Sequence, residues 1–236
     1  MRDGSIIPFV DHFLVITSDN SGGIGNKEQD VVHVAYETVS YYAFRVAIME
    51  CLSLGATPVS VIVNNFCGDR EWTDLVRGVE RGMRELGHAD MTITGSSETN
   101  IPLVQSAVGI VVIGKKRTRM LPTIQVSDEL RFAVIGKPLV GEEVITLQKD
   151  VAPLPCFQWM YEQEKVAGVI PVGSKGILYE VNQLLSSEIQ ADRVQVELDV
   201  HKSAGPSTCF IVAYEKEIHE KVRSKAGAYF YPMIVK

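Results

Sequence analysis

The segment TSDNSGGIGNKEQD, residues 17–30, has residue types suited to binding phosphate and a metal ion. It carries three glycines, then Lys27, with a carboxylate towards each end at Asp19 and Asp30. Glycines allow positive φ and close approach of the backbone N–H groups to an anion. Carboxylates beside a phosphate favour Mg²⁺, which takes one or two carboxylates together with phosphate oxygens. A plain glycine-rich turn explains the same spacing, and neither GxxxxGK[ST] nor GxGxxG is present.

Two further carboxylates, Glu50 and Glu98, are candidate functional residues because of their surroundings in the sequence. Glu50 falls on the apolar side of an expected helix over residues 37–54, where an ionised group is costly to bury unless it is paired or coordinated. A structural ion pair or an exposed helix end is the alternative. Glu98 lies in TGSSETN, residues 94–100, among hydroxyl and amide side chains, which is also the composition of a tight polar turn. The five histidines are scattered, and we assign none of them as a catalytic base.

The elements that must position these residues follow from hydrophobic periodicity and glycine or proline stops. In the first half we expect the helix 37–54 and a second helix over 71–87, with Gly55 and Gly87 as stops. Strands are expected at 12–17, 30–34, 58–66, 90–94 and 105–114, and in the second half at 194–200, 207–214 and 229–235. Strands and helices mix without strict alternation, which predicts an α+β fold with a mixed or antiparallel sheet.

The segment KKRTRMLPTIQVSDE, residues 115–129, is the expected connection between two domains, 1–118 and 119–236. Its basic residues are interpreted as a solvated linker, with a phosphate-facing role as the alternative. After it, GVIPVGSKGILYEVNQLLSS (168–187) predicts a strand, a turn and an amphipathic helix. A charged helix is expected at 215–227.

The bulk composition limits the functional class. The 236 residues carry a net charge of −6, which argues against non-specific binding to nucleic acid or to an anionic membrane. The N-terminal residues MRDGSIIPFVDHF lack the features of a signal peptide, and no apolar stretch reaches the length of a membrane span. Four scattered cysteines without CxxC spacing indicate free thiols in a reducing cytoplasm.

Taken in order, three motifs resemble one superfamily: aminoimidazole ribonucleotide synthetase, thiamine-monophosphate kinase, selenophosphate synthetase and a hydrogenase maturation factor. GGIGNK (22–27) resembles its DGVGTK loop, ECLSLGATP (50–58) its D-x4-GA-x-P helix end, and GSSET (95–99) its GG[DE]T turn. FAVIGKPLVG, IPVGSKGILYEV and KSAGPST resemble parts of its C-terminal domain. The resemblance spans nearly the whole chain.

The resemblance implies an N-terminal sheet domain with helices on one face, a barrel formed across a homodimer, and a smaller C-terminal α+β domain. It implies ATP and Mg²⁺ as cofactors and transfer of a phosphoryl group to a small-molecule acceptor. Lys27, Asp19 and Glu50 would be catalytic, and Asp19, Asp30, Glu50 and Glu98 would face the metal. The nucleotide would contact Asn20, Gly22, Gly23, Gly25, Lys27, Ser96, Ser97 and Thr99.

Departures from the family pattern narrow the choice of member. Glu50 stands where the family has aspartate, Gly22 stands at the position of the loop acid, and Ser96-Ser97 replaces a glycine. The short second domain favours a small acceptor. Overall size together with SDNSGGIG and SAGPST resembles the group assigned to α-ribazole phosphorylation in cobalamin salvage. Alternatives are another kinase or synthetase of the superfamily, or a nucleotide-binding protein without catalysis.

Overall fold

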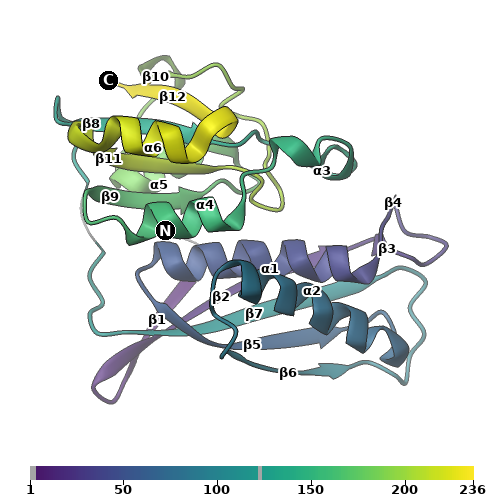
Figure 1. Ribbon diagram of the computed structural model, residues 1–236. Coiled ribbons are helices and arrows are strands. Elements are labelled where there is room, and N and C mark those ends of the chain that lie inside the picture. The colour runs from purple at the N-terminus through teal and green to yellow at the C-terminus, as the bar shows by residue number, and fades with distance from the viewer. Residues whose placement is uncertain (1–3, 122–123) are drawn as a thin grey trace. The chain divides into compact units, whose positions relative to one another are not determined.

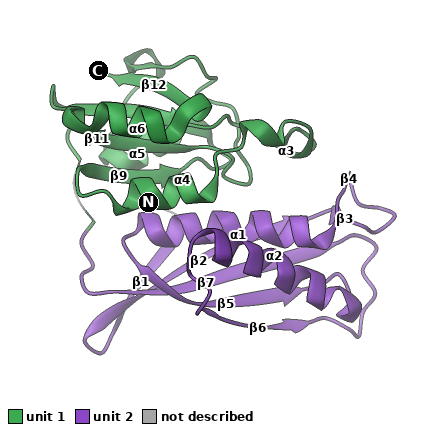
Figure 2. Ribbon diagram, in the orientation of Figure 1, with its two compact units in different colours: residues 1, 121–236 green, residues 2–120 purple. Residues whose placement is uncertain are grey.

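The computed structural model describes residues 4–121 and 124–236, and it divides into two compact units. In chain order, the first unit ends at Met120 (purple, numbered 2 in the key of Figure 2) and the second begins at Leu121 (green, numbered 1 in the key). The expected linker residue Pro122 and the first three residues of the chain lie outside the described ranges.

A five-stranded mixed sheet forms the first unit, in the order β1-β2-β7-β5-β6 (Figure 1). Only β5 and β6 run parallel, since α2 connects them, and the other neighbours are antiparallel. The strands are β1 (Gly4–Phe9), β2 (His12–Gly22), β5 (Thr57–Asn65), β6 (Thr92–Ser97) and β7 (Ala107–Lys116). The short strands β3 (Ile24–Gly25) and β4 (Val32–His33) pair with each other beside the sheet.

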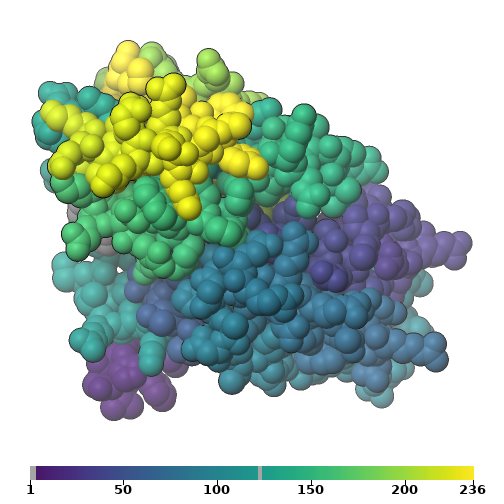
Figure 3. All heavy atoms as spheres, in the orientation of Figure 1, coloured from purple at the N-terminus to yellow at the C-terminus, as the bar shows by residue number. Residues whose placement is uncertain are grey.

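Helices α1 (Tyr36–Ser53) and α2 (Trp72–Glu85) cover one face of this sheet (Figure 1). Alternation along β7 explains the arrangement, because Val108, Ile110 and Val112 are buried while Val111 and Ile113 between them are only half-buried. Figure 3 shows α2 (blue) on the outside of this unit. It packs against α1 at Gly78, where a Cβ atom would lie 2.1 Å from the carbonyl oxygen of Glu37. This close contact requires glycine.

The second unit is an antiparallel sheet in the order β10-β12-β8-β11-β9, with helices on both faces. The strands are β8 (Leu130–Ile135), β9 (Val166–Pro171), β10 (Val194–Gln195), β11 (Phe210–Glu215) and β12 (Phe230–Val235). The helices are α3 (Glu143–Thr146), α4 (Leu154–Glu162), α5 (Gly176–Leu185) and α6 (His219–Ala226). Neighbouring side chains of β11 pack on opposite faces of the sheet. Ile211 joins the core cluster of Ile177 from α5, whereas Phe210 contacts Phe157 of α4 with ring centroids 5.1 Å apart. Burial on both faces explains the continuous apolar sequence of this strand.

The α+β class with a mixed sheet and a second, antiparallel sheet is confirmed, but several local expectations were wrong. Strand β2 runs to Gly22 and β6 to Ser97, so Asp19 and Ser96 lie in paired strands instead of loops. Residues 30–34 and 194–200 form only two-residue strands. Lys116 of the expected solvated linker is buried, and its Nζ donates to the carbonyl oxygen of Leu54 at 2.5 Å. Within residues 4–121 and 124–236, no helix is long and apolar enough to span a membrane.

Candidate functional site

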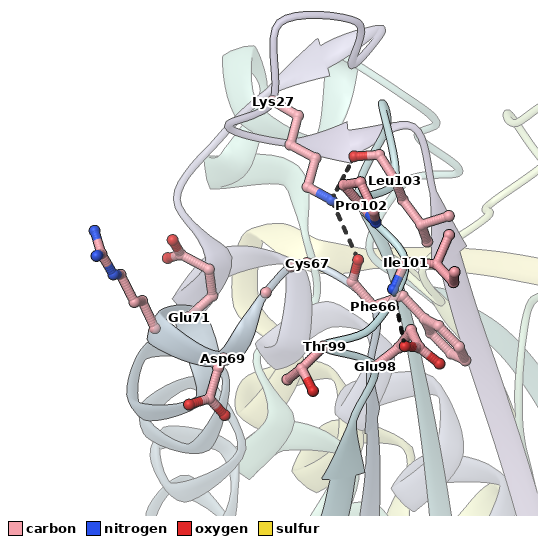
Figure 4. Close-up of a pocket in the computed structure, with 12 residues that line it drawn as sticks. Lys27, Phe66, Cys67, Asp69, Glu71, Glu98, Thr99, Ile101, Pro102 and Leu103 are labelled. Carbon is pink, nitrogen blue, oxygen red and sulfur yellow. Dashed lines mark hydrogen bonds between the residues drawn. The ribbon is translucent and has the colours of Figure 1, made fainter.

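A cavity of about 480 Å³ opens beside Lys27 in the first unit, and we call it the Lys27 pocket (Figure 4). It forms where the glycine-rich segment meets the C-terminal ends of β5 and β6, which run parallel and end on the same side. Its size is within the range of small-molecule sites. The lining residues are Lys27, Phe66, Cys67, Gly68, Asp69, Arg70, Glu71, Glu98, Thr99, Ile101, Pro102 and Leu103.

The Lys27 side chain points towards main-chain carbonyl groups at the edge of the pocket (Figure 4). Its Nζ donates to the oxygens of Leu103 at 2.9 Å, Phe66 at 3.2 Å and Gln105 at 3.4 Å. These contacts are exposed to solvent. The three carbonyl oxygens take up the three N–H donors of the ammonium group, which is therefore a positive charge with a defined position on the pocket wall. A phosphate that bound it directly would replace one of these carbonyl oxygens, of which Gln105 makes the longest contact.

Behind Lys27, the carboxylate of Asp30 anchors the glycine segment. Its Oδ1 accepts from the N–H of Ser106 at 2.7 Å, and its Oδ2 accepts from the Ser106 hydroxyl at 2.7 Å and from the N–H of Lys27 at 2.9 Å. Burial of the carboxyl raises its pKa, but these hydrogen bonds outweigh burial and leave the pKa of Asp30 below its usual value. Asp30 is thus held ionised inside the loop, 6% exposed.

Glu98 follows the last residue of β6 and contributes a carboxylate to the pocket. Its Oε1 accepts from the N–H groups of Asn100 at 2.6 Å and Ile101 at 3.2 Å, which lowers the pKa of Glu98. Of the residues predicted from sequence, the structure brings Lys27, Glu98 and Thr99 together in this pocket. The site roles of these residues remain predictions.

The other predicted site residues do not line the pocket. Asp19, Asn20 and Gly22 belong to β2, Ser96 and Ser97 belong to β6, and Glu50 is buried in α1 at 8% exposure. The N–H of Gly23 donates to the Ser106 oxygen, so it is already engaged. Across residues 4–121 and 124–236, no three His, Cys, Asp or Glu side chains group so as to hold a metal ion. The predicted carboxylates therefore do not form one preassembled metal cluster.

Sequence reasoning missed the wall formed by Asp69, Arg70 and Glu71, and the apolar side formed by Phe66, Ile101 and Leu103 (Figure 4). One signal was available, because CGDRE follows a buried strand directly and precedes a helix. Parallel strands that end on the same side place the segments after them next to each other, but the parallel pairing of β5 with β6 was not predicted.

Asp19 gives a pH-dependent expectation. Burial raises its pKa from 3.8 to about 7, against a smaller lowering by the backbone of Asn20. Between these values the folded chain binds a proton that the unfolded chain releases, so the free energy of unfolding falls as pH rises through this range. The Asp19→Asn variant lacks this titration. Its stability relative to wild type should therefore rise between about pH 5 and about pH 8 in urea unfolding experiments.

Asp90→Asn serves as the control, because Asp90 is an exposed carboxylate of the same unit. Its stability relative to wild type should stay constant over the same range. A constant difference for Asp19→Asn as well would show that Asp19 ionises as an ordinary exposed carboxylate does.

Comparison with protein-family models found no match, and comparison with curated proteins found none either. Solved structures do match. A thiamine monophosphate kinase from Aquifex aeolicus gives a TM-score of 0.65 at 11% identity, over 100% of this chain and 89% of that one. The hydrogenase maturation protein HypE in complex with ATP gives 0.60 at 10% identity, over 94% and 76%. T. maritima PurL complexed with ATP gives 0.59 at 12% identity, over 98% and 42%, so this chain spans about two fifths of PurL.

At these identities the likeness concerns the fold, and it extends over both units. The fold expected from the sequence motifs is thereby confirmed. This chain has the α+β fold that the thiamine monophosphate kinase, HypE and PurL share.

Proposed function

We propose that the protein is a Mg-ATP-dependent phosphotransferase that binds its nucleotide in the Lys27 pocket. The observation that carries this proposal is a fixed ammonium group and several carboxylates around one cavity of suitable volume. Support comes from the fold, because solved structures with this fold include complexes with ATP, ADP and AMPPCP. The three sequence motifs that resemble the superfamily also favour an ATP-dependent reaction.

The pocket residues fit the parts of a nucleotide. Lys27 would contact a phosphate, and Phe66, Ile101 and Leu103 offer an apolar surface for the base. Glu98, Asp69 and Glu71 are hard oxygen donors of the kind that Mg²⁺ prefers. Mg²⁺ needs only one or two carboxylates beside phosphate and water, so the lack of a preassembled cluster does not oppose binding. The ion would neutralise phosphate charge.

Chemically, the acceptor hydroxyl attacks the γ-phosphorus, the bond to the bridging oxygen breaks, and ADP leaves while a proton is released. The protein contributes position and positive charge, which is most of what phosphoryl transfer needs. Metal contacts by Asp19 and Glu50 remain predictions, and they would require those side chains to act from outside the described pocket lining.

Our proposed acceptor is α-ribazole, on the basis of the sequence resemblance. Purified protein with Mg-ATP should convert α-ribazole to α-ribazole 5'-phosphate and ADP in equal amounts, measured by chromatography with mass spectrometry. Turnover of thiamine monophosphate instead would replace the acceptor and keep the reaction class. Release of AMP would indicate a synthetase. Normal ATP binding without turnover of any acceptor would indicate a nucleotide-binding protein without catalysis.

We also propose that two copies of the chain associate through the sheet face opposite α1 and α2. Ile16 and Ile113 pair across β2 and β7 on this face, and Val111 lies on the same side. Ile7 of the edge strand is 44% exposed. Light scattering should therefore give a mass near twice 26.0 kDa. A mass of one chain at every concentration would contradict this proposal.

A further inference from the structure

We propose that Asp30 is a positioning residue for Lys27 and not a metal ligand. The proposal rests on the proposed function as far as it concerns catalysis. It assigns to Asp30 a role that follows from its contacts, whereas the motif comparison had placed it among the metal-facing carboxylates.

The first argument is that the acceptor capacity of Asp30 is directed inward. Three donors converge on the carboxylate at 2.7–2.9 Å, two from Ser106 and one from the backbone of Lys27. The side chain is 6% exposed, and Asp30 is not among the residues that line the Lys27 pocket. A cation could reach these oxygens only if it displaced buried N–H and O–H donors, which would then lack partners.

A second argument is that the two ends of Lys27 are tied to the same neighbouring segment. The backbone N–H of Lys27 is held by Asp30, which itself is held by Ser106. The side-chain Nζ donates to the oxygens of Leu103 and Gln105, which belong to the segment that leads to Ser106. Its remaining contact is with the oxygen of Phe66, after the end of β5. The carboxylate therefore fixes where the Lys27 backbone stands relative to residues 103–106, and this fixes where the ammonium group reaches the pocket.

A third argument is that Ser106, the main partner of Asp30, is itself held in place by contacts with Tyr36 and Gly25. The Ser106 hydroxyl lies 2.8 Å from the hydroxyl of Tyr36, the first residue of α1. Gly25 passes so close that a Cβ there would lie 2.5 Å from the Ser106 Oγ. Asp30, Ser106 and Tyr36 thus connect the glycine segment to the start of α1 and to the segment that leads into β7.

The test compares Asp30→Asn with Ser106→Ala and with Asp90→Asn, the same chemical change at an exposed site. Amide hydrogen exchange without nucleotide comes first. In Asp30→Asn, exchange at Lys27 and Ser106 should accelerate at least about tenfold, because the amide group cannot accept all three donors. Ser106→Ala keeps the carboxylate and its two backbone contacts, so it should show a smaller change. If Asp30→Asn does not fold, the exchange rate at Lys27 in Ser106→Ala still shows whether this hydrogen-bonded cluster holds Lys27.

Kinetics with Mg-ATP then separate positioning from metal binding. Asp30→Asn should lower kcat/KM for ATP by about tenfold to a hundredfold, because Lys27 is no longer held in place. The Mg²⁺ concentration for half-maximal rate should stay at the wild-type value. Asp90→Asn should match wild type in every measurement.

Two results would overturn the proposal. Recovery of Asp30→Asn activity at raised Mg²⁺, with unchanged exchange at Lys27, would make Asp30 a metal ligand. Unchanged exchange and unchanged kinetics would leave it without either role. If the wild-type chain neither binds nor uses ATP, the proposed function fails by itself. The nucleotide-free exchange experiment still decides whether Asp30 holds Lys27.

Discussion

Replacement of Lys27 by methionine is expected to lower kcat/KM for ATP by about a hundredfold, equivalent to about 2.7 kcal/mol of transition-state stabilisation. Methionine keeps an unbranched apolar side chain of nearly the same length but removes the ammonium group and its charge. The γ-phosphoryl group develops charge on its oxygens during transfer, and Lys27 is the ammonium group on the wall of the pocket. Steady-state kinetics with varied ATP at saturating Mg²⁺ measure this effect.

A matched control is available in Lys149→Met, because Lys149 is an exposed lysine of the second unit. It should retain wild-type kinetics. Thermal unfolding of both variants shows whether the lost contacts of Lys27 with Leu103 and Phe66 alter stability. Wild-type kcat/KM in a folded Lys27→Met variant would remove Lys27 from the site.

Gly25→Ala is expected to destabilise the protein by roughly 2–4 kcal/mol and to abolish nucleotide binding in the same step. Gly25 has φ +155°, and a Cβ there would lie 2.5 Å from the Ser106 Oγ and 2.7 Å from the Tyr36 ring. Part of the lost stability comes from backbone strain, and part comes from overpacking against Ser106 and Tyr36. Urea unfolding gives the first quantity, and calorimetric titration with ATP gives the second.

Gly22→Ala is the control for this prediction, because nothing lies within 4 Å of the added Cβ and its φ is unstrained. The same substitution three residues earlier should change the free energy of unfolding by less than about 0.5 kcal/mol. Equal effects at Gly22 and Gly25 would show that glycine content, and not the contact at Ser106, determines the stability of the segment.

The sequence predicted those features of the fold that depend on local periodicity. The helix expected over 37–54 is α1, and the strand expected over 105–114 is β7 with a two-residue shift. Burial of Glu50 at 8% exposure agrees with its place on the apolar side of α1. These features follow from the spacing of apolar residues and from glycine stops, which act within a few residues.

Features that depend on distant partners were not predicted. Nothing near Asp30 indicates that its acceptors are saturated, because two of its three donors come from Ser106, 76 residues away. Asp19 was read as a loop residue because the apolar run ends at Ile16, yet its pairing with Ile110 of β7 extends the strand. The polar end of that strand is supported by its neighbour and not by its own composition.

The residues of the candidate site also divide into those that the local sequence reveals and those that depend on distant partners. Lys27 and Glu98 were found from their types and their neighbours. Phe66 and Asp69 were not, because only the parallel pairing of β5 with β6 places the segment after Asn65 beside the segment after Ser97. A single sequence holds little information about that pairing.

Amide hydrogen exchange of the wild-type protein with and without Mg²⁺ and AMPPCP tests the central claim most directly, since it needs no acceptor. Binding in the Lys27 pocket should protect three segments that are far apart in sequence, 27–31, 66–71 and 98–105, and leave the second unit's exposed 145–149 unchanged. Absence of protection at saturating nucleotide, or protection confined to other segments, would contradict the account.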